Sequence, residues 1–285
     1  MKCLKVPRRK LGELKGVEVH PGYNIIFDGE YALIPVSIFQ GELVECNPLP
    51  KERTPRLNEL IPGLSSFYKV GDILIISPKR EIRGEELDLI LKTYRAKSLF
   101  IRKKVKGEFR VNELIHVAGE NRTTTIFSES GIKYFVDVSK VYVNPSMATE
   151  RLRIVNEIDR GKVLDVFTGY GALAIPLSKK LGYAVAGDIN LDGLLMALKS
   201  VHLNSSKILL DLVQYDGKYL PFRDKAFDLA VGDNPTAIDD FVNEICRVSL
   251  KAVIYKLGKL DAGWERVNDY SKDLFIMKRF LRCDN

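Results

Sequence analysis

Glycines and acidic residues that follow apolar segments in the second half of the chain could hold a nucleotide-like cofactor. The run Asp165-Val-Phe-Thr-Gly-Tyr-Gly contains two glycines, which leave room for a sharp backbone turn and a close ligand. Asp188 ends the next apolar run, where its carboxylate can accept both hydroxyls of a ribose. The candidate cofactor-binding residues are Asp165, Phe167, Gly169, Gly171, Asp188, Asp216, Asn234 and Pro235.

A dinucleotide competes for the same pattern, because nicotinamide-binding folds also carry an acidic residue about 20 positions after a glycine turn. The full GxGxxG spacing is not met after Gly171, and a lone GxG pair also occurs in plain turns. Asp216 precedes Gly217 and could itself be a turn aspartate. The segments DVFTGYG, GDIN and VGDNP, in this order and spacing, favour S-adenosylmethionine.

The elements that must position these residues alternate along the chain. Strand-like runs VLDVF, AVAGDI, ILLDLV, FDLAVGD, KAVIYKL and LFIMKRFL are separated by helix-like runs such as ALAIPLSKKL, LDGLLMALKSVHL and IDDFVNEICRVSL. Such alternation predicts a parallel, doubly wound sheet covered by helices. Ligands of these sheets bind at the carboxyl ends of the strands, which is where the candidate residues fall.

Two smaller α+β domains are expected ahead of this sheet. Residues 1–45 alternate apolar and polar positions, and the proline-rich, charged segment CNPLPKERTPR at 46–56 is typical of a linker. Residues 57–141 contain the strand-like DILIIS, the amphipathic EELDLILKTYRA and the strand-like SLFIRKKV. The nucleotide-binding domain is expected at 142–285, beginning near the helix-like TERLRIVNEI.

Composition bounds the partners and the compartment. The formal net charge is +7, and Glu108 is the one acid in the basic run from Lys92 to Arg110, which would attract a phosphate backbone or could be a solvated basic face. No apolar run approaches the roughly 20 residues of a membrane span, and no signal peptide is indicated, so we expect a cytoplasmic protein. The four cysteines are scattered without a CxxC pair, which favours reduced thiols and no metal site.

The segments GEFRVNEL, AGENRTTT and KVYVNPSMATERLRI ahead of DVFTGYG resemble the tRNA (guanine-37-N1)-methyltransferase family of archaea and eukaryotes, with its wyosine-pathway paralogues. CLKVP and YALIPV extend the resemblance to the amino-terminal part. It implies a class I, Rossmann-like methyltransferase domain, S-adenosylmethionine as cofactor, tRNA as partner, and a monomer whose first domain anchors the tRNA. The reaction implied is methyl transfer to N1 of guanine 37, next to the anticodon.

That reaction needs a carboxylate to take the N1 proton and a cation or donors at O6. By resemblance, Glu150 is the general base, Arg110 faces O6, and Tyr142 and Asp233 occupy motif positions at the site. From the residues alone, Glu150 could equally favour a helix dipole, Arg110 could contact phosphate, and Tyr142 could be strand packing. The candidate RNA-binding residues are Asn121, Arg122, Thr123, Arg151, Lys103 and Lys104, of which the first three could also form a plain polar loop.

The chain departs from the family pattern at three places, of which Asp233 bears on the target atom. Ser146 stands where the family has an arginine, and Asp233-Asn234-Pro235 stands where it has N-L-P. An ionised Asp233 only accepts hydrogen bonds and would oppose negative charge growing on the base. The ending MKRFLRCDN lacks the family's Y-A-P segment, so we expect either reduced substrate contacts or a reduced last strand.

Several alternatives therefore remain open. Wyosine-pathway paralogues transfer methyl or an aminocarboxypropyl group to modified guanine-37. Asn234-Pro235-Thr236 is also distantly similar to the N/D-P-P-Y/F motif that orients an exocyclic amine. A third alternative is a paralogue that binds tRNA without catalysis.

Overall fold

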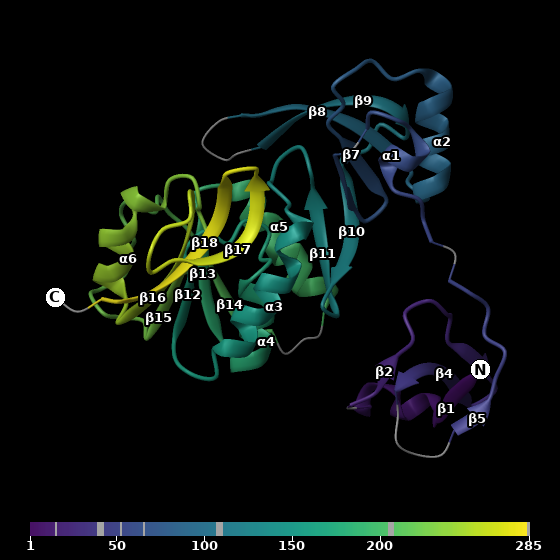
Figure 1. Ribbon diagram of the computed structural model, residues 1–285. Coiled ribbons are helices and arrows are strands. Elements are labelled where there is room, and N and C mark those ends of the chain that lie inside the picture. The colour runs from purple at the N-terminus through teal and green to yellow at the C-terminus, as the bar shows by residue number, and fades with distance from the viewer. Residues whose placement is uncertain are drawn as a thin grey trace. The chain divides into compact units, whose positions relative to one another are not determined.

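We analysed a computed structural model of the chain, which describes residues 1–14, 16–38, 43–51, 53–64, 66–106, 111–204 and 208–283 (Figure 1). The chain divides into two compact units, Met1–Pro55 and Arg56–Asn285. None of the helices in the described ranges is long and apolar enough to cross a membrane.

The first unit is a small antiparallel sheet. Its central strand β1 (Lys2–Pro7) pairs with β4 (Tyr31–Ile38) on one side and with β5 (Leu43–Glu45) on the other. The remaining elements are η1 (Arg8–Glu13), β2 (Glu18–Val19) and β3 (Ile26–Asp28). Leu4, Val6, Ala32 and Ile34 form its core, as the alternation of apolar residues predicts.

The expectation of reduced thiols was wrong. Cys3 is bonded to Cys46 in the first unit, and Cys246 to Cys283 in the second. Cysteines 43 and 37 positions apart give no local signal of pairing. The antiparallel register decides the first pair, because it places Cys3 opposite Val44, two residues before Cys46.

The second unit begins with a four-stranded sheet of order β6-β7-β8-β9. The strand and helix expected in DILIIS and EELDLILKTYRA are present, and the helix makes the crossover between the parallel strands β7 and β8. Leu74, Ile90 and Leu99 pack in its core. The bounds are α1 (Leu57–Leu60), β6 (Phe67–Val70), β7 (Ile73–Ile76), α2 (Gly84–Tyr94), β8 (Ser98–Lys106) and β9 (Val111–Gly119).

A hairpin links this sheet to the larger one. Strands β10 (Thr124–Glu129) and β11 (Ile132–Asp137) pair with each other, and the backbone N–H of Phe135 donates to Ser200 of helix α5 (Leu191–Leu203) at 3.0 Å. Buried Tyr134 donates its hydroxyl to the carbonyl oxygen of Ala172 at 3.2 Å. Arg56–Asn285 is one compact unit, so the domain boundary expected at 142 stays a prediction.

The large sheet has seven strands in the order β14-β13-β12-β15-β16-β18-β17. The first five are parallel, and the sheet ends in an antiparallel hairpin of β17 and β18. Its strands are β12 (Val163–Asp165), β13 (Ala184–Asp188), β14 (Leu210–Gln214), β15 (Leu229–Gly232), β16 (Lys251–Gly258), β17 (Glu265–Ser271) and β18 (Leu274–Arg282). Strand β18 has nine residues, so the last strand is fully formed, and the alternative of reduced substrate contacts stays a prediction.

Helices cover both faces of this sheet, as the alternation of elements predicts (Figure 1). Val163, Val231 and Val253 face the layer of α3 and α4, whereas their chain neighbours Leu164, Ala230 and Ala252 face α6. In the strand order β14-β13-β12-β15-β16, the chain order reverses between β12 and β15. A ligand site is expected at this reversal. The remaining elements are η2 (Pro145–Met147), α3 (Ala148–Glu157), α4 (Ala174–Leu181), η3 (Ile238–Asp240) and α6 (Val242–Val248).

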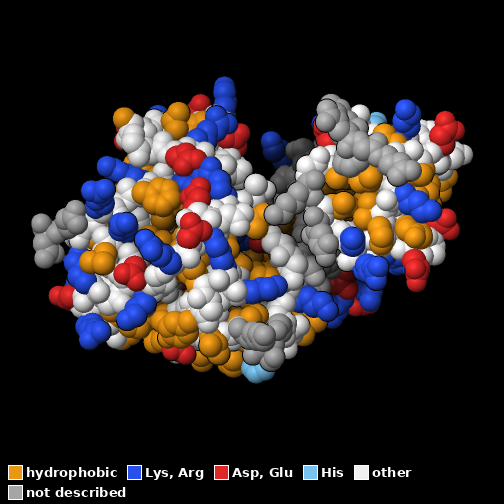
Figure 2. All heavy atoms as spheres, turned by 90° about the horizontal axis from the view of Figure 1, so that it is seen from below, with side chains coloured by type: hydrophobic (Ala, Val, Ile, Leu, Met, Phe, Trp, Pro, Cys, Tyr) orange, Lys and Arg blue, Asp and Glu red, His pale blue; other side chains and the backbone are white. Residues whose placement is uncertain are grey.

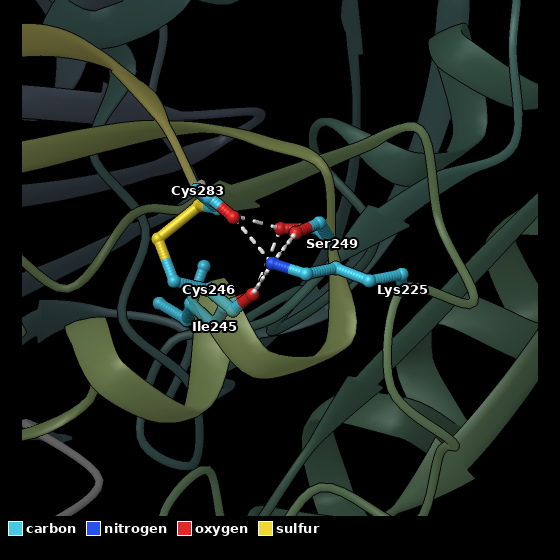
Figure 3. The surroundings of a disulfide bond; sticks show 5 residues. All are labelled: Lys225, Ile245, Cys246, Ser249 and Cys283. Carbon is cyan, nitrogen blue, oxygen red and sulfur yellow. Dashed lines mark hydrogen bonds between the residues drawn. A yellow bond between two sulfur atoms is a disulfide. The ribbon is translucent and has the colours of Figure 1, made fainter. Parts of the chain in front are cut away.

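The second disulfide joins Cys246 of α6 to Cys283, the residue after the last strand (Figure 3). The ammonium group of Lys225 donates to the carbonyl oxygens of Cys246 at 3.1 Å and Ser249 at 3.4 Å, and also to that of Cys283. The hydroxyl of Ser249 donates to the carbonyl oxygen of Ile245 at 2.8 Å. One lysine thus satisfies carbonyl groups at the end of the helix and beyond the strand.

Candidate active site

A pocket opens at the carboxyl ends of β12, β13, β14 and β15, where the chain order reverses. The segment before and within α3 contributes Tyr142, Asn144, Met147 and Arg151 to the lining, and Leu257, Tyr270 and Ile276 come from the other end of the sheet. Seven of the eight candidate cofactor residues also line it: Asp165, Phe167, Gly169, Asp188, Asp216, Asn234 and Pro235.

The glycine turn after β12 has the geometry expected of it. Gly169 and Gly171 have φ angles of 52° and 85°, which disfavour residues with a Cβ atom. A Cβ on Gly171 would also lie 2.9 Å from a side-chain carbon of Ile175, so this residue shapes the turn although it does not line the pocket. The turn is fixed to the neighbouring strand because the N–H of Gly169 donates to Asp188 at 2.8 Å.

Asp188 is held at the end of β13 by backbone donors. Its Oδ2 atom accepts from Gly169, and its Oδ1 atom accepts from the N–H of Asn190 at 2.9 Å. Burial raises the pKa of Asp188, and these backbone hydrogen bonds act in the opposite direction. The carboxylate is therefore fixed in orientation, half-buried and on the pocket wall, as a ribose-binding acid must be.

Asp165 lies deeper, 2% exposed, at the end of β12. Its Oδ2 atom has no hydrogen-bond partner among the described residues. Burial, together with the charges of Asp233 and Asp188, raises the pKa of Asp165 to about 7. An unpartnered buried carboxyl oxygen in the pocket wall fits a ligand that brings a cationic donor, such as the ammonium group of S-adenosylmethionine.

Four carboxyl groups, those of Asp165, Asp188, Asp216 and Asp233, line the same pocket. They suit the cationic sulfonium and ammonium groups of S-adenosylmethionine and would repel the pyrophosphate of a dinucleotide. Phe167 and Phe241 add an aromatic wall, with ring centroids 4.9 Å apart. A Cβ on Gly217 would lie 2.8 Å from Phe167, so this wall requires a glycine after Asp216.

Arg151 brings a buried cation to the pocket. Its Nε and Nη2 atoms donate to the two carboxylate oxygens of Glu129 at 2.7 and 2.6 Å, and Nη2 also donates to the carbonyl oxygen of Asn144 at 3.1 Å. Burial works against the charged form, but Glu129 and the charge of Asp233 raise the pKa of Arg151. The residue expected to contact RNA is thus part of the pocket wall.

Glu150, the expected general base, does not line the pocket. Its Oε1 atom accepts the hydroxyl of Tyr255 at 2.9 Å and lies 3.2 Å from the ammonium group of Lys278. Its Oε2 atom lies 2.9 Å from Nε of Arg153. Burial, followed by the charges of Asp233 and Glu150, raises the pKa of Tyr255. The carboxylate of Glu150 is therefore enclosed by the hydroxyl of Tyr255 and the cations of Lys278 and Arg153.

The other expected site residues are divided. Tyr142 and Asp233 line the pocket, whereas Arg110 lies outside the described residues. Ser146 donates its hydroxyl to Asn144 at 2.6 Å and accepts from the side chain of Asn268 at 2.8 Å. The position that holds an arginine in the family pattern is therefore tied to strand β17.

Of the expected RNA-binding residues whose side chains the structure describes, Arg151 alone lines the pocket. Arg122 forms ion pairs with Asp72 at 2.7 Å and Glu120 at 3.1 Å, so it braces the turn after β6. The carbonyl of Thr123 accepts from Val138 at 2.9 Å, and Asn121 is exposed. Lys103 is exposed, and the side chain of Lys104 lies outside the described residues. On the face in Figure 2, basic and acidic side chains are interspersed.

Sequence reasoning missed Glu129, Tyr255 and Lys278. Lys278 stands among apolar residues in FIMKRFL, and this position predicts a buried ion pair but not its partner. In the structure, its side chain is 1% exposed. Glu129 and Tyr255 carry no local signal, because only the packing of the hairpin and of β16 brings them to Arg151 and Glu150.

Comparison with known proteins fits this geometry. Residues 125–257 match the TRM5/TYW2 methyltransferase domain. The tRNA (guanine(37)-N(1))-methyltransferase Trm5b of Methanocaldococcus jannaschii is 33% identical over 281 residues, which cover 80% of this chain and 82% of that protein. The chain belongs to the TRM5/TYW2 methyltransferase family.

A second relative and a solved structure are also similar to this chain. Trm5b of Pyrococcus abyssi is 35% identical over 205 residues, which cover 65% of this chain and 61% of that protein. The complex structure of aTrm5 and tRNALeu has a TM-score of 0.72 at 24% identity and covers 100% of both chains. The resemblance seen in the motifs and the Rossmann-like methyltransferase fold are both confirmed.

Proposed function

We propose that the protein transfers the methyl group of S-adenosylmethionine to N1 of guanine 37 in tRNA. The observation that carries this proposal is the pocket itself. It joins the unpartnered carboxyl oxygen of Asp165 and the fixed carboxylate of Asp188 to Arg151, Tyr142 and Asp233, so a methyl donor and a polar base fit one site. The names of the relatives Trm5b support the same reaction.

The cofactor supplies an electrophilic methyl group on a sulfonium centre. The carboxylate of Asp188 would accept hydrogen bonds from the ribose hydroxyls, and that of Asp165 would accept one from the ammonium group. The aromatic wall of Phe167 and Phe241 would exclude water from the apolar part of the pocket. Asp216 lines the pocket and would contribute to cofactor binding. Its Oδ1 atom also caps the turn by accepting from the N–H of Lys218 at 2.9 Å.

The base would enter the pocket unstacked from its tRNA neighbours, because the methyl donor would be bound within that pocket. Arg151 would face the negative charge that grows on the purine, and Tyr142 would contact the base. The roles of Arg110 at O6 and of Glu150 as base stay predictions from the resemblance. The unit Met1–Pro55 would anchor the tRNA body, and we propose a monomer acting in the cytoplasm.

The test is an assay with radiolabelled S-adenosylmethionine and unmodified tRNA transcripts that carry G37 or A37, followed by nucleoside mass spectrometry. We expect label in N1-methylguanosine from the G37 transcript. The departures at Ser146 and Asp233 favour a second candidate, transfer to a wyosine precursor, and that candidate predicts cofactor binding without label on either transcript. Loss of cofactor binding as well would indicate a tRNA-binding paralogue without catalysis.

A further inference from the structure

The pocket is lined by one aromatic side chain that is largely exposed to solvent. Tyr270 belongs to the lining, yet 55% of its surface is exposed. Tyr170, which lines the same pocket, is only 4% exposed. A residue that is both in the lining and at the surface lies where the pocket meets solvent. Tyr270 can therefore contact a group at the entrance of the pocket.

Strand β17 departs from regular pairing at Tyr270. Asp269 is paired with Phe275 of β18, and Ser271 is paired with Leu274, so two steps along β17 correspond to one step along β18. Tyr270 is thus the extra residue of a β-bulge. Bulges at the edges of sheets change the direction of a side chain, and β17 is the edge strand of the seven-stranded sheet. The regular alternation is broken at the position where the tyrosine joins the pocket lining.

The strand that carries Tyr270 is fixed beside the segment that precedes α3. The side chain of Asn268 donates to the hydroxyl of Ser146 at 2.8 Å. Ser146 donates in turn to the side chain of Asn144, which also lines the pocket. Tyr270 is thus presented by a restrained strand, which lowers the entropy cost of ordering its ring on a ligand.

The strand order separates Tyr270 from the candidate cofactor residues. Asp188 ends β13 and Asp216 follows β14, and these two strands lie at one end of the sheet. Strand β17 lies at the opposite end. The ring of Tyr270 is therefore remote along the sheet from the acids expected to hold the cofactor, and it borders the part of the pocket that remains for the substrate.

An exposed aromatic ring at this place suits a nucleobase. Every base has a flat π-face, and aromatic side chains bind single-stranded RNA by stacking on such faces. A target base that leaves its stack to enter the pocket uncovers one face of each neighbouring base. An aromatic ring at the entrance can cover one of these faces, because the neighbours stay outside while the target base is inside.

We propose, building on the methyl transfer proposed above, that Tyr270 forms a stacking subsite for a base next to the target in the tRNA. The ring replaces the stacking partner that this neighbour loses, so it stabilises the RNA with its target base turned into the pocket. Tyr270 binds RNA in this way and does not touch the reacting atoms. The subsite adds a contact for the substrate that the cofactor residues do not provide.

The first experiment measures the affinity for G37 transcripts by filter binding, with S-adenosylhomocysteine present to prevent turnover. Tyr270→Ala should lower the affinity roughly 5- to 100-fold, the effect of losing one stack between a base and an aromatic ring. Tyr270→Phe keeps the ring and should match the wild type. Tyr219→Ala is the matched control, because Tyr219 is 79% exposed and does not line the pocket. Equal losses in Tyr270→Phe and Tyr270→Ala would overturn the proposal, since the hydroxyl and not the ring would then matter.

Cofactor affinity, measured by isothermal titration calorimetry without tRNA, tests whether the ring acts on the RNA. It should be the same in the wild type and in the Tyr270 and Tyr219 variants, which also shows that the variants are folded. A loss of cofactor affinity in Tyr270→Ala as large as its loss of tRNA affinity would assign the ring to the cofactor and overturn the proposal.

Transcripts with a single abasic site identify the stacked base. The site is placed before the target, at the target or after it, and each RNA is bound to the wild type and to Tyr270→Ala. Removal of the stacked neighbour should weaken binding to the wild type and have little effect on Tyr270→Ala, because both changes delete the same contact. This coupling should appear at one of the two neighbouring positions. Coupling at the target alone, or at none of the three positions, would overturn the proposal.

The binding measurement separates this inference from the proposed function. Methylation of the G37 transcript without coupling at either neighbour would leave the proposed function standing and refute the stacking subsite. Coupling at a neighbour without label on either transcript would support the subsite and refute N1 methylation.

Discussion

At the scale of single residues, the pocket depends on carboxyl groups whose surroundings differ. Asp188 is oriented by two backbone N–H groups, whereas one oxygen of Asp165 is buried without a partner. The arrangement of Asp188 suits neutral hydroxyl donors, and the unpartnered oxygen of Asp165 suits a positively charged donor. Two variants test this division.

Asp188→Asn should weaken S-adenosylmethionine binding by at least about tenfold, because the amide replaces one acceptor of the ribose hydroxyls with a donor. Isothermal titration calorimetry measures the affinity. Asp192→Asn is the matched control, since Asp192 lies four residues on, pairs with Lys140 at 3.0 Å and does not line the pocket. Equal affinities of the two variants would contradict the role of Asp188.

Asp165→Asn should stabilise the protein without cofactor at pH 8, by roughly 2–4 kcal/mol. Burial raises the pKa of Asp165 in the fold to about 7, so the folded protein binds a proton that the unfolded chain has already lost. The stability that this bound proton gives the folded protein is complete below the unfolded-state pKa, near 4, and is lost as pH rises through about 7. Urea unfolding at pH 4 and 8 checks it: the gain should vanish at pH 4, and the variant should lose cofactor affinity.

At the scale of elements, the last strand is held in two ways. The disulfide from Cys246 to Cys283 fixes its end beside α6, and Lys278 fixes its middle to the cluster around Glu150. A nine-residue strand with a buried lysine is therefore restrained along its length. Each restraint can be removed separately.

Replacing Cys246 and Cys283 together by serine should lower the free energy of unfolding of the unit Arg56–Asn285 by about 2–4 kcal/mol, because the crosslink restricts the unfolded chain. Urea unfolding followed by the fluorescence of Trp264, the single tryptophan, reports on this unit. The control replaces Cys3 and Cys46, whose disulfide lies in Met1–Pro55. A similar shift of the Trp264 transition in that control would argue against a local effect.

Lys278→Met should destabilise the fold by about 3–5 kcal/mol, since it leaves the buried carboxylate of Glu150 without its ammonium partner. Adding Glu150→Gln to this variant should recover part of the loss, because the unpaired charge is removed as well. Lys256→Met is the control, because its ion pair with Asp239 is exposed to solvent and should contribute less than about 1 kcal/mol. Thermal and urea unfolding of the four proteins measure these differences.

At the scale of the whole molecule, the positive net charge should make the affinity for tRNA depend on salt concentration. With a formal net charge of +7, tRNA binding should release counterions from the phosphate backbone. The affinity for tRNA should therefore fall by about tenfold or more between roughly 50 and 200 mM salt. Filter binding measures it, and the affinity for S-adenosylmethionine over the same range is the internal control. A tRNA affinity that does not change with salt would contradict phosphate recognition.

The sequence by itself determined the doubly wound sheet and most of the candidate residues that line the pocket, because both depend on local patterns. Apolar periodicity fixes each element, and strand ends in such a sheet meet at one edge, so Asp165, Asp188 and Asp233 could be placed in one pocket before their distances were known. Only the tertiary structure decided the partners of distant residues. The pairing of Cys3 with Cys46, of Arg151 with Glu129 and of Glu150 with Lys278 depends on register and packing, which no local pattern records. Because of that packing, the glutamate expected in the pocket lies outside its lining and the aspartate lies within it.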